Sequence, residues 1–432
     1  MRQKRKKHYT INFILLLLTA AGILILVMTT LQRDTTSSQE TMQQLPTASD
    51  VGVPPPEETA TATPVEIVPT PSPSPNPSPT PQYNEAVWIA VGDVMMHKPQ
   101  LPGSYDKKTK KYSFDSYFTD VKPILADGDW VMANLETPVA GPAYGYTGYP
   151  SFNAPIELLE GLQKAGFNIL TTANNHSLDK GEKGLLLTLK HIKELNIPFK
   201  GTAATQEEAD SPVIIDQNGI KMGVLSYTYG TNGIPLPKGK PYMVSLIEEN
   251  KIIEDIQKTK QAGADFVTVA LHFGTEYQTK PNEEQKRLAR KLVAEGADII
   301  AGSHPHVIQP YEVLEATDSN GEVRRGLIIY SMGNFISNQR EDTKDYGVIF
   351  KVLIRKNMTD NTIELREIES IPTWVHRYKP DAYYRYRILP VEETIEASSD
   401  TLLSQADYTS LKNHLKLLRS RLDSMLTKTK GT

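Results

Sequence analysis

Five apolar, β-branched runs in this chain each end in a short polar motif. This pattern predicts buried strands that carry polar side chains at their carboxyl ends. Strand ends of one sheet can bring a carboxylate, an amide and several imidazoles into one crevice, which is how open α/β sheets build sites. These side chains are also the usual ligands of a metal centre. The five segments are Val87–Asp93, Val131–Glu136, Ile169–His176, Val267–His272 and Ile299–His306.

Between and after these runs, other segments show helical or strand spacing. A hairpin is predicted where residues 212–215 and 220–227 flank a polar turn, and later strands at 326–330, 347–355 and 362–375 add antiparallel character. This alternation predicts an α/β fold with two packed sheets and outer helices. The expected helices are Pro155–Gly166, Glu182–Asn196, Leu246–Ala262 and Asn282–Gly296.

The uncharged apolar run Ile11–Leu31 predicts a transmembrane helix, because at about 1.5 Å per residue it spans roughly 30 Å. Basic residues precede it, so residues 1–10 are expected in the cytoplasm and the main domain outside the cell membrane. The run is longer than the apolar core of a cleavable signal, which favours an uncleaved, single-pass signal anchor over a secreted form.

Residues 32–84 are rich in Pro, Thr and Ser and cannot bury a core, so we expect a disordered linker. It either holds the folded body away from the membrane or is a solvated segment without a specific role. The body is expected at 85–375 and a C-terminal extension at 376–432. The extension contains an amphipathic helix, with Leu411, Leu415, Leu418 and Leu422 on one face, that either packs on the body or binds a partner.

Composition narrows the chemistry. The chain has no cysteine, so any metal must be bound by nitrogen and oxygen ligands. The formal net charge is −4, and five positive charges lie before residue 8, so the remaining chain is more acidic still. An acidic body is a poor nucleic-acid binder, and a polyanionic partner would need a local basic patch or a metal.

Asp93 and Glu136 are the candidate carboxylate ligands. Asp93 follows the first strand, although it could also cap a turn. His97 lies four residues further on and could reach the same ion or form part of the wall. Glu136 ends the second strand, and its two oxygens could bridge two cations.

The remaining candidate ligands are an amide and three imidazoles. The motif Asn174-Asn175 offers a hard amide oxygen, and His272 stands at a strand end, where a satisfied core histidine is the alternative. His304 and His306 flank a stiff proline, so each ring could bind a different ion of a pair. Nitrogen and oxygen ligation suits Mn, Zn, Fe or Mg, so we expect one or two divalent ions of open identity.

His176 is the candidate acid, since an imidazole can protonate a leaving group. Asp179, three residues further on, could orient the ring and raise its basicity. A purely structural turn is the alternative at this motif. The residues expected to face substrate are Glu276, Tyr277, Gln309 and Asn334.

Six motifs occur in order over residues 86–340: GDVMMH, ANLETP, TTANNHSLDKG, LHFGTEY, GSHPHVIQP and YSMGNF. With these motifs the chain resembles the CapA/PgsA-type capsule-synthesis family of bacterial poly-γ-glutamate production. That family is in turn similar to calcineurin-like metallophosphoesterases. The resemblance implies a metallophosphoesterase-like, two-sheet β-sandwich with flanking helices and a two-metal centre.

The resemblance also implies roles for particular residues. The phosphoesterase pattern has Asp-x-His, whereas this chain has Met95 at that place and histidine only at position 97. It has Gly-Asp at the bridging position, whereas this chain has Leu135 and Glu136. The implied assignment is Asp93 and His306 on one ion, Glu136 as the bridge, Asn175, His272 and His304 on the second ion, and His176 as the acid.

By resemblance, the chain takes part in making, exporting or attaching poly-γ-glutamate or a related envelope polymer, with a metal-dependent hydrolase or transferase site. The expected partners are the cytoplasmic membrane, the polymer and membrane synthase subunits. One alternative is a non-catalytic scaffold subunit of a membrane polymer synthase. Another is a metal-dependent phosphodiesterase unrelated to capsule.

Overall fold

The computed structural model describes residues 82–317, 321 and 323–426. The predicted basic segment and transmembrane anchor, and all but the end of the linker, lie outside these residues. Tyr83 and Asn84, which the sequence placed in the linker, are the first residues of strand β1. Within the described part of the chain, no helix has the length and apolar character needed to cross a membrane.

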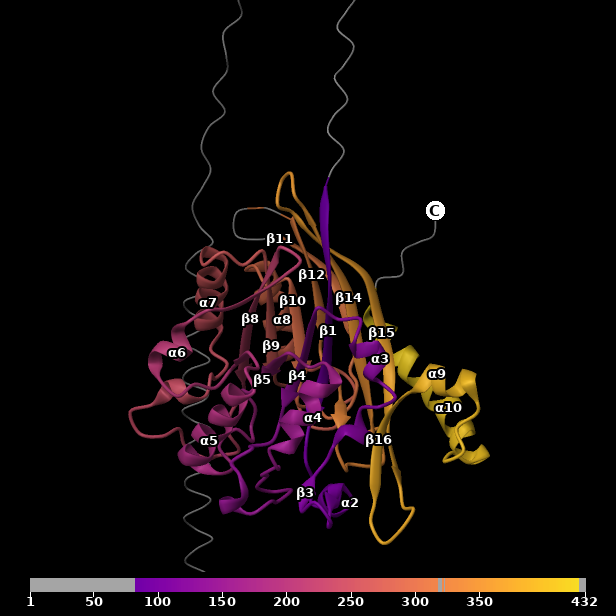
Figure 1. Cartoon of the computed structure of the whole chain (residues 1–432). Helices are drawn as coiled ribbons and strands as arrows, with labels where there is room; N and C mark the ends of the chain where they lie inside the picture. The colour runs from indigo at the N-terminus through magenta and orange to yellow at the C-terminus, as the bar shows by residue number, and fades with distance from the viewer. Residues whose placement is uncertain (1–81, 318–320, 322, 427–432) are drawn as a thin grey trace, which may run out of the picture. The chain divides into compact units, whose positions relative to one another are not determined.

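The described residues form a mixed α/β fold in which two sheets face each other (Figure 1). The first sheet has the order β16-β15-β14-β1-β4-β5-β6, with β13 beside β1, and its strands β1, β4, β5 and β6 are parallel. Its strands are β1 (Tyr83–Val94), β4 (Trp130–Leu135), β5 (Ile169–Thr171), β6 (Phe199–Lys200), β13 (Asn334–Ile336), β14 (Tyr346–Asn357), β15 (Ile363–Tyr378) and β16 (Arg385–Pro390).

The second sheet has the order β11-β12-β10-β9-β8-β7, and its four inner strands are parallel. The predicted hairpin is confirmed, because β7 and β8 pair around Asn218 and Gly219, both with positive φ. The strands are β7 (Val213–Gln217), β8 (Ile220–Thr228), β9 (Phe266–His272), β10 (Ile299–Ser303), β11 (Tyr311–Thr317) and β12 (Val323–Ile329). A small separate ribbon joins β2 (Tyr105–Asp106) and β3 (Lys111–Tyr112).

Helices cover the outer face of each sheet. The helix α4 packs its leucines on the first sheet, and α7 and α8 pack on the second. The helices are α2 (Gln100–Ser104), α3 (Lys122–Leu125), α4 (Glu157–Ala165), α5 (Gly181–Glu194), α6 (Gln206–Asp210), α7 (Glu249–Gln261), α8 (Glu283–Ala294), α9 (Val391–Ala397) and α10 (Gln405–Leu422). Short 3-10 turns are η1 (Asp115–Tyr117), η2 (Pro142–Tyr144), η3 (Pro241–Met243) and η4 (Asp423–Met425).

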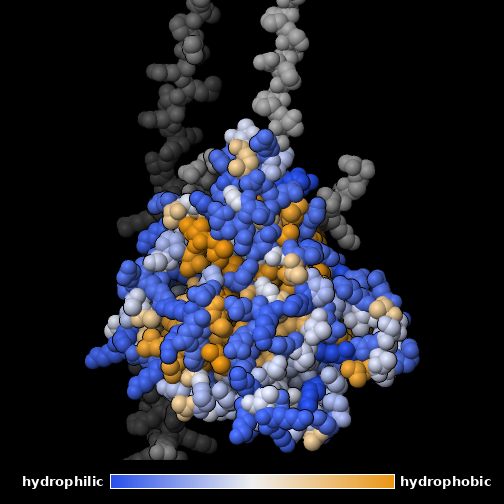
Figure 2. All heavy atoms as spheres, viewed as in Figure 1, coloured by the Kyte–Doolittle hydropathy of each residue, from blue (hydrophilic) through white to orange (hydrophobic). Residues whose placement is uncertain are grey.

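The core between the sheets is formed by alternate residues of facing strands, such as Trp88 and Trp130 on one side and Phe266 and Leu327 on the other. Side chains in a strand alternate between its faces, so the other residues of β1 and β4 pack against the outer helices. Figure 2 shows largely hydrophilic side chains on the surface in this view, with apolar residues exposed in patches between them.

The helix ends follow the predicted signals. Asn282 and Gln285 form a capping box at the start of α8, and Gly296, with φ 118°, follows its end. The C-terminal helix α10 buries Leu411, Leu418 and Leu422 in the core, which confirms packing on the body. The strand β15 runs through residue 375 and pairs with β16, so the sheet continues into the C-terminal extension.

One expectation was wrong. The sequence pattern assigned all five motif-bearing strands to one sheet, but β1, β4 and β5 belong to the first sheet and β9 and β10 to the second. Apolar runs identify buried strands without saying which strands pair, so the division between sheets was not encoded in the pattern. The parallel strands of both sheets end at the same edge of the sandwich, where the motifs meet.

Candidate metal centre

A cluster of carboxylate, amide and imidazole groups lies at this shared edge. All of these side chains are at most 3% exposed. The structure brings together all six of the ligands predicted from the sequence, and they are Asp93, Glu136, Asn175, His272, His304 and His306.

Asp93 sits where β1 passes very close to the segment before β13. Its backbone N–H donates to Gly333 O at 2.9 Å, and a Cβ on Gly92 would lie 1.9 Å from that oxygen. Glycine at position 92 therefore permits this contact. One Asp93 oxygen, Oδ2, lies 3.0 Å from His306 Nδ1, and the other accepts a hydrogen bond from Asn134 at 2.8 Å.

Glu136 lies between two groups of potential ligands. Its Oε1 is 3.4 Å from His272 Nε2 and 3.8 Å from His306 Nε2. The same nitrogen of His272 is 2.8 Å from Asn175 Oδ1. Two sets of groups that could hold an ion share this carboxylate. One set is Asp93, Glu136 and His306, and the other is Glu136, His272 and His304. Within each set the ligand atoms lie within 4.8 Å of one another.

The buried polar atoms fit a bound cation. Both carboxylate oxygens of Glu136 are buried without a hydrogen-bond partner, and so is Nδ1 of His304. Buried polar groups in folded proteins are nearly always paired, and an unpaired buried carboxylate is costly. A divalent cation held by oxygen and imidazole ligands would satisfy all of these atoms at once.

The electrostatics of the cluster are strongly perturbed. Burial and the neighbouring Asp93 raise the pKa of Glu136 well above its ordinary value. Burial opposes ionisation of Asp93, but the hydrogen bond to His306, the charges of His306 and His272 and the hydrogen bond from Asn134 together outweigh it and lower the Asp93 pKa to about 2. Burial also acts against a charged His306, yet Glu136 and Asp93 raise its pKa to about 9. Burial lowers the pKa of His272 to about 3 and that of His304 to about 2, so both are neutral imidazoles.

The loop after β10, which carries His304 and His306, has a strained backbone. His304 has φ 99° and His306 has φ 58°, and nearby Tyr277 has φ 65°. Each left-handed residue other than glycine costs roughly 1–2 kcal/mol. The Tyr277 N–H donates to Pro305 O at 2.8 Å, which ties the β9 and β10 loops together. Strain of this kind persists where a fixed geometry is needed.

His176 and Asp179 form a buried pair beside the cluster. His176 Nδ1 lies 2.8 Å from Asp179 Oδ2, and the ring of Phe152 packs edge-on against the imidazole at 4.6 Å between centroids. Asp179 also accepts the backbone N–H of Phe152 at 2.7 Å. The orienting contact predicted from the sequence is present, and it leaves Nε2 as the free ring nitrogen.

The four residues predicted to bind substrate fall into two groups. Glu276 and Tyr277 lie at the exposed mouth of the cluster, with the Tyr277 ring 6.0 Å from that of His306. Gln309 is fully buried, and its amide donates to Gln278 O and Lys280 O. Asn334 is also fully buried and donates to His306 O and Lys344 O. These two amides hold the loops around the site.

His97 does not join the cluster. Its Nδ1 accepts the backbone N–H of Asn338 at 3.3 Å, and its ring packs edge-on against Phe152. Burial lowers its pKa to about 4. Among the described residues it belongs to none of the potential ligand sets, so it forms part of the wall.

Sequence reasoning missed several residues that support the ligands. Asn134 holds Asp93, and Ser303 Oγ lies 2.9 Å from His272 Nδ1. Tyr229 packs its ring 4.6 Å from that of His304, and Asn232 accepts from Asn175 at 3.1 Å. Tyr229 and Asn232 follow the end of β8, so the strand-end rule used for the other motifs would have found them.

The fold and the cluster define a two-sheet α/β protein with a buried set of side chains at the strand ends that could hold a metal ion. Residues 87–339 match the family model described as "Bacterial capsule synthesis protein PGA_cap". The chain therefore belongs to this family of bacterial capsule synthesis proteins.

Individual relatives agree with this assignment. The chain is 32% identical to "Capsule biosynthesis protein CapA" of Bacillus anthracis over 64% of its length, and it spans 65% of that protein. It is 31% identical to "PGA biosynthesis protein CapA" of Bacillus subtilis, over 67% of this chain and 72% of that protein. The chain thus spans less than two thirds of the Bacillus anthracis relative.

Solved structures similar to the chain include the calcineurin-like phosphoesterase YfkN from Bacillus subtilis, at 15% identity and a TM-score of 0.40, over 78% of this chain and 100% of that one. A phosphatase from Mycoplasma pneumoniae also has 15% identity and a TM-score of 0.40, over 67% of this chain and 94% of that one.

Proposed function

We propose that this protein is a membrane-anchored, extracytoplasmic component of capsule biosynthesis, acting on poly-γ-glutamate or a related envelope polymer through a divalent-metal site. The family and its CapA relatives support the capsule role. The uncharged run Ile11–Leu31 and the basic residues before it support the anchor and its orientation. The polymer itself and membrane synthase subunits are the proposed partners.

The reaction that suits the site is hydrolysis or transfer at a phosphoryl or amide group. A bound divalent ion would supply a nucleophilic water near neutral pH and a positive charge that polarises the substrate oxygen. Asp93, Glu136, Asn175 and the imidazoles of His272, His304 and His306 would hold the ions. His176 would donate the proton to the leaving group from Nε2, because Nδ1 is bonded to Asp179.

The observation that carries the proposal is the environment of Glu136. Its side chain is 0% exposed, both oxygens lack hydrogen-bond partners, and imidazoles approach it from two directions. A fold that needed this residue only for packing would not keep an unpaired carboxylate in its interior.

The test is metal retention by the full chain after loading and dialysis. We expect the wild-type protein to retain Mn²⁺ or Zn²⁺ and the double variant His304→Ala/His306→Ala to lose it, as measured by elemental analysis. His414→Gln is the matched control, because this histidine lies on α10 beside Tyr346 and not in the cluster. Equal metal content in the wild type and the double variant would refute the ligand assignment.

A scaffold without catalysis is the second candidate. Among the described residues, the set around Asp93 contains three carboxylate or imidazole groups, Asp93, Glu136 and His306. Met95 stands where the phosphoesterase pattern has a further histidine. Assays of the full chain with Mn²⁺, Zn²⁺ or Mg²⁺ on phosphodiester and γ-glutamyl substrates separate the two. Absence of turnover with every metal, together with intact polymer binding, would favour the scaffold. Turnover of phosphodiesters alone would favour a phosphodiesterase unrelated to capsule.

A further inference from the structure

Glu276 lies at the mouth of the cluster and reaches two of its histidines. Its carboxylate, His304 and His306 each offer a ligand atom within 4.8 Å of the others. Glu276 is exposed, whereas His304 and His306 are 3% and 2% exposed and Glu136 is completely buried. The same two histidines belong to the inner sets that contain Glu136. They therefore connect a solvent-facing carboxylate to a buried one.

The loop that carries Glu276 is fixed in place. Gly274 has φ 102°, and a Cβ there would lie 2.5 Å from the side chain of Gln285. The residue after Glu276 is the left-handed Tyr277, whose N–H is bonded to the carbonyl of Pro305, between the two histidines. In addition, Nδ1 of His304 is buried without a partner. The carboxylate is thus held beside an imidazole that has an unused ligand atom.

We propose that Glu276 is the loading ligand of the metal centre: together with His304 and His306 it captures a divalent cation from solvent and passes it to Glu136. This inference rests on the proposed metal site and adds the route by which that site is filled. No covalent bond is formed or broken in this step, and no proton or electron is transferred. The cation only exchanges one carboxylate ligand for another.

The shared histidines make this outer set a transit position. An imidazole nitrogen that binds an ion in an inner set cannot bind another in the outer set. Each inner set combines Glu136 with either Asp93 or His272, and all of these side chains are buried. The outer set instead contains the exposed Glu276. Removing Glu276 should therefore slow filling of the centre more than it changes the final metal content.

The experiment compares uptake rates of full-length protein stripped with a chelator. Zn²⁺ is added with a fluorescent zinc indicator, and both the uptake rate and the final zinc content are measured. We expect Glu276→Gln to slow uptake about tenfold, in the range of electrostatic effects on association, and to reach the wild-type content. Asp342→Asn is the matched control. This carboxylate is 86% exposed and lies 3.8 Å from Lys344, whose ammonium is over the Tyr277 ring. Asp342 belongs to none of the ligand sets found among the described residues.

Each other outcome overturns the proposal in a distinct way. A wild-type uptake rate in Glu276→Gln would show that this residue takes no part in loading. Equal slowing in Asp342→Asn would show a general effect of charge at the mouth. Loss of final zinc content in Glu276→Gln would make this residue a permanent ligand. A wild-type protein that binds no zinc would refute the metal site itself.

Discussion

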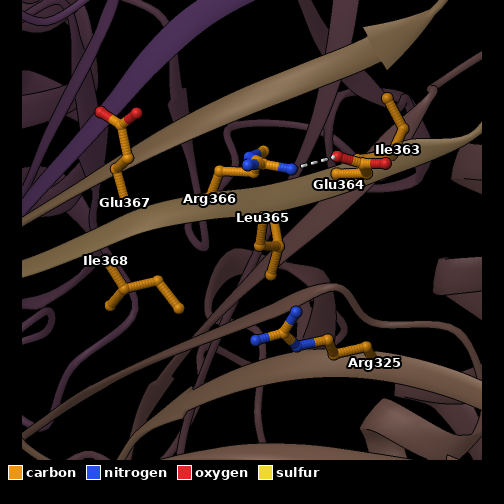
Figure 3. Close-up of a pocket in the computed structure, with 7 residues that line it drawn as sticks. All are labelled: Arg325, Ile363, Glu364, Leu365, Arg366, Glu367 and Ile368. Carbon is orange, nitrogen blue, oxygen red and sulfur yellow. Dashed lines mark hydrogen bonds and ion pairs between the residues drawn. The ribbon is translucent and has the colours of Figure 1, made fainter.

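The two ends of the sandwich differ in what their polar groups do. At the carboxyl ends of the parallel strands, buried side chains converge on Glu136. At the other end, where β1 and β15 begin, a groove of about 740 Å³ is lined by Arg325 of β12 and residues 363–368 of β15 (Figure 3). Its Arg366 and Glu364 pair at 3.1 Å with side chains that are each about half exposed, and Figure 3 shows Arg325 and Glu367 lying well apart.

The difference shows that room for a ligand does not by itself make a site. Charges in the groove face water and each other, and exposed ion pairs contribute only about 0–1 kcal/mol. The candidate metal cluster instead holds buried atoms whose bonding is incomplete. Unsatisfied buried polar atoms, together with strained backbone at His304 and His306, distinguish the end that carries the candidate site.

The strongest test of this contrast is Glu136→Gln. We expect metal affinity to fall by more than about 100-fold, because even residues that only support ligands cost 10–100-fold. The metal-free variant should also be more stable than the wild type by about 1–3 kcal/mol at neutral pH, since a carboxyl group that burial makes costly to ionise is removed. Elemental analysis and urea unfolding in chelator check both effects. The control Glu364→Gln, in the groove, should change neither, and metal retention by Glu136→Gln would remove the basis of the contrast.

Asp179→Asn should lower turnover about 100-fold on any substrate that the wild type converts, because His176 loses the carboxylate that orients it. Metal content should stay the same, since neither residue belongs to a ligand set among the described residues. Steady-state kinetics and elemental analysis on the same preparation measure the two quantities. Loss of metal in this variant would instead assign Asp179 to the support of the centre.

The pH dependence of the metal-free protein should follow the buried histidines. The pKa values of His272 and His304 lie near 3 and 2 and that of His97 near 4, against an ordinary 6.5. Below pH 6.5 the unfolded chain therefore binds protons that the folded chain does not. For each such proton, the free energy of unfolding falls by about 1.4 kcal/mol per unit decrease in pH. Glu136, whose pKa is raised, acts in the opposite direction.

Burial also lowers the pKa of His376 to about 4, so four histidines oppose Glu136. We therefore expect lower stability at about pH 5 than at about pH 6.5. The contribution of His306, with its pKa near 9, is fully present below pH 6.5 and does not change across this window. Urea midpoints at the two pH values measure the effect. His304→Asn should reduce the loss, and an unchanged loss in that variant would show that this imidazole is not held neutral.

The smallest expected effect is that of Arg366→Gln in the groove. Its partner Glu364 is exposed, so the free energy of unfolding should change by less than about 0.5 kcal/mol and metal content should not change. Thermal unfolding and elemental analysis suffice. A large loss of stability or of metal would show that the two ends of the sandwich are coupled.

Much of the fold and the candidate ligands could be predicted from local sequence. The strands that end at Asp93, Glu136 and His272 were visible as apolar runs followed by polar motifs, because side-chain periodicity is local. The amphipathic face of α10 was visible for the same reason. The positions of Gln309 and Asn334 were not, because whether an amide faces a cleft or holds a neighbouring loop depends on chain that is distant in sequence.

The sequence by itself determined which residues could ligate a metal and that they stand at strand ends, since residue type and alternation are properties of each segment. Only the tertiary structure decided that three of these strands lie in one sheet and two in the other, and that Glu136 lies between the imidazoles of His272 and His306. It also decided that His97 stays outside and that Glu276 reaches the histidines. Contacts between the two sheets join residues far apart in the chain, and they are fixed by how the whole core packs.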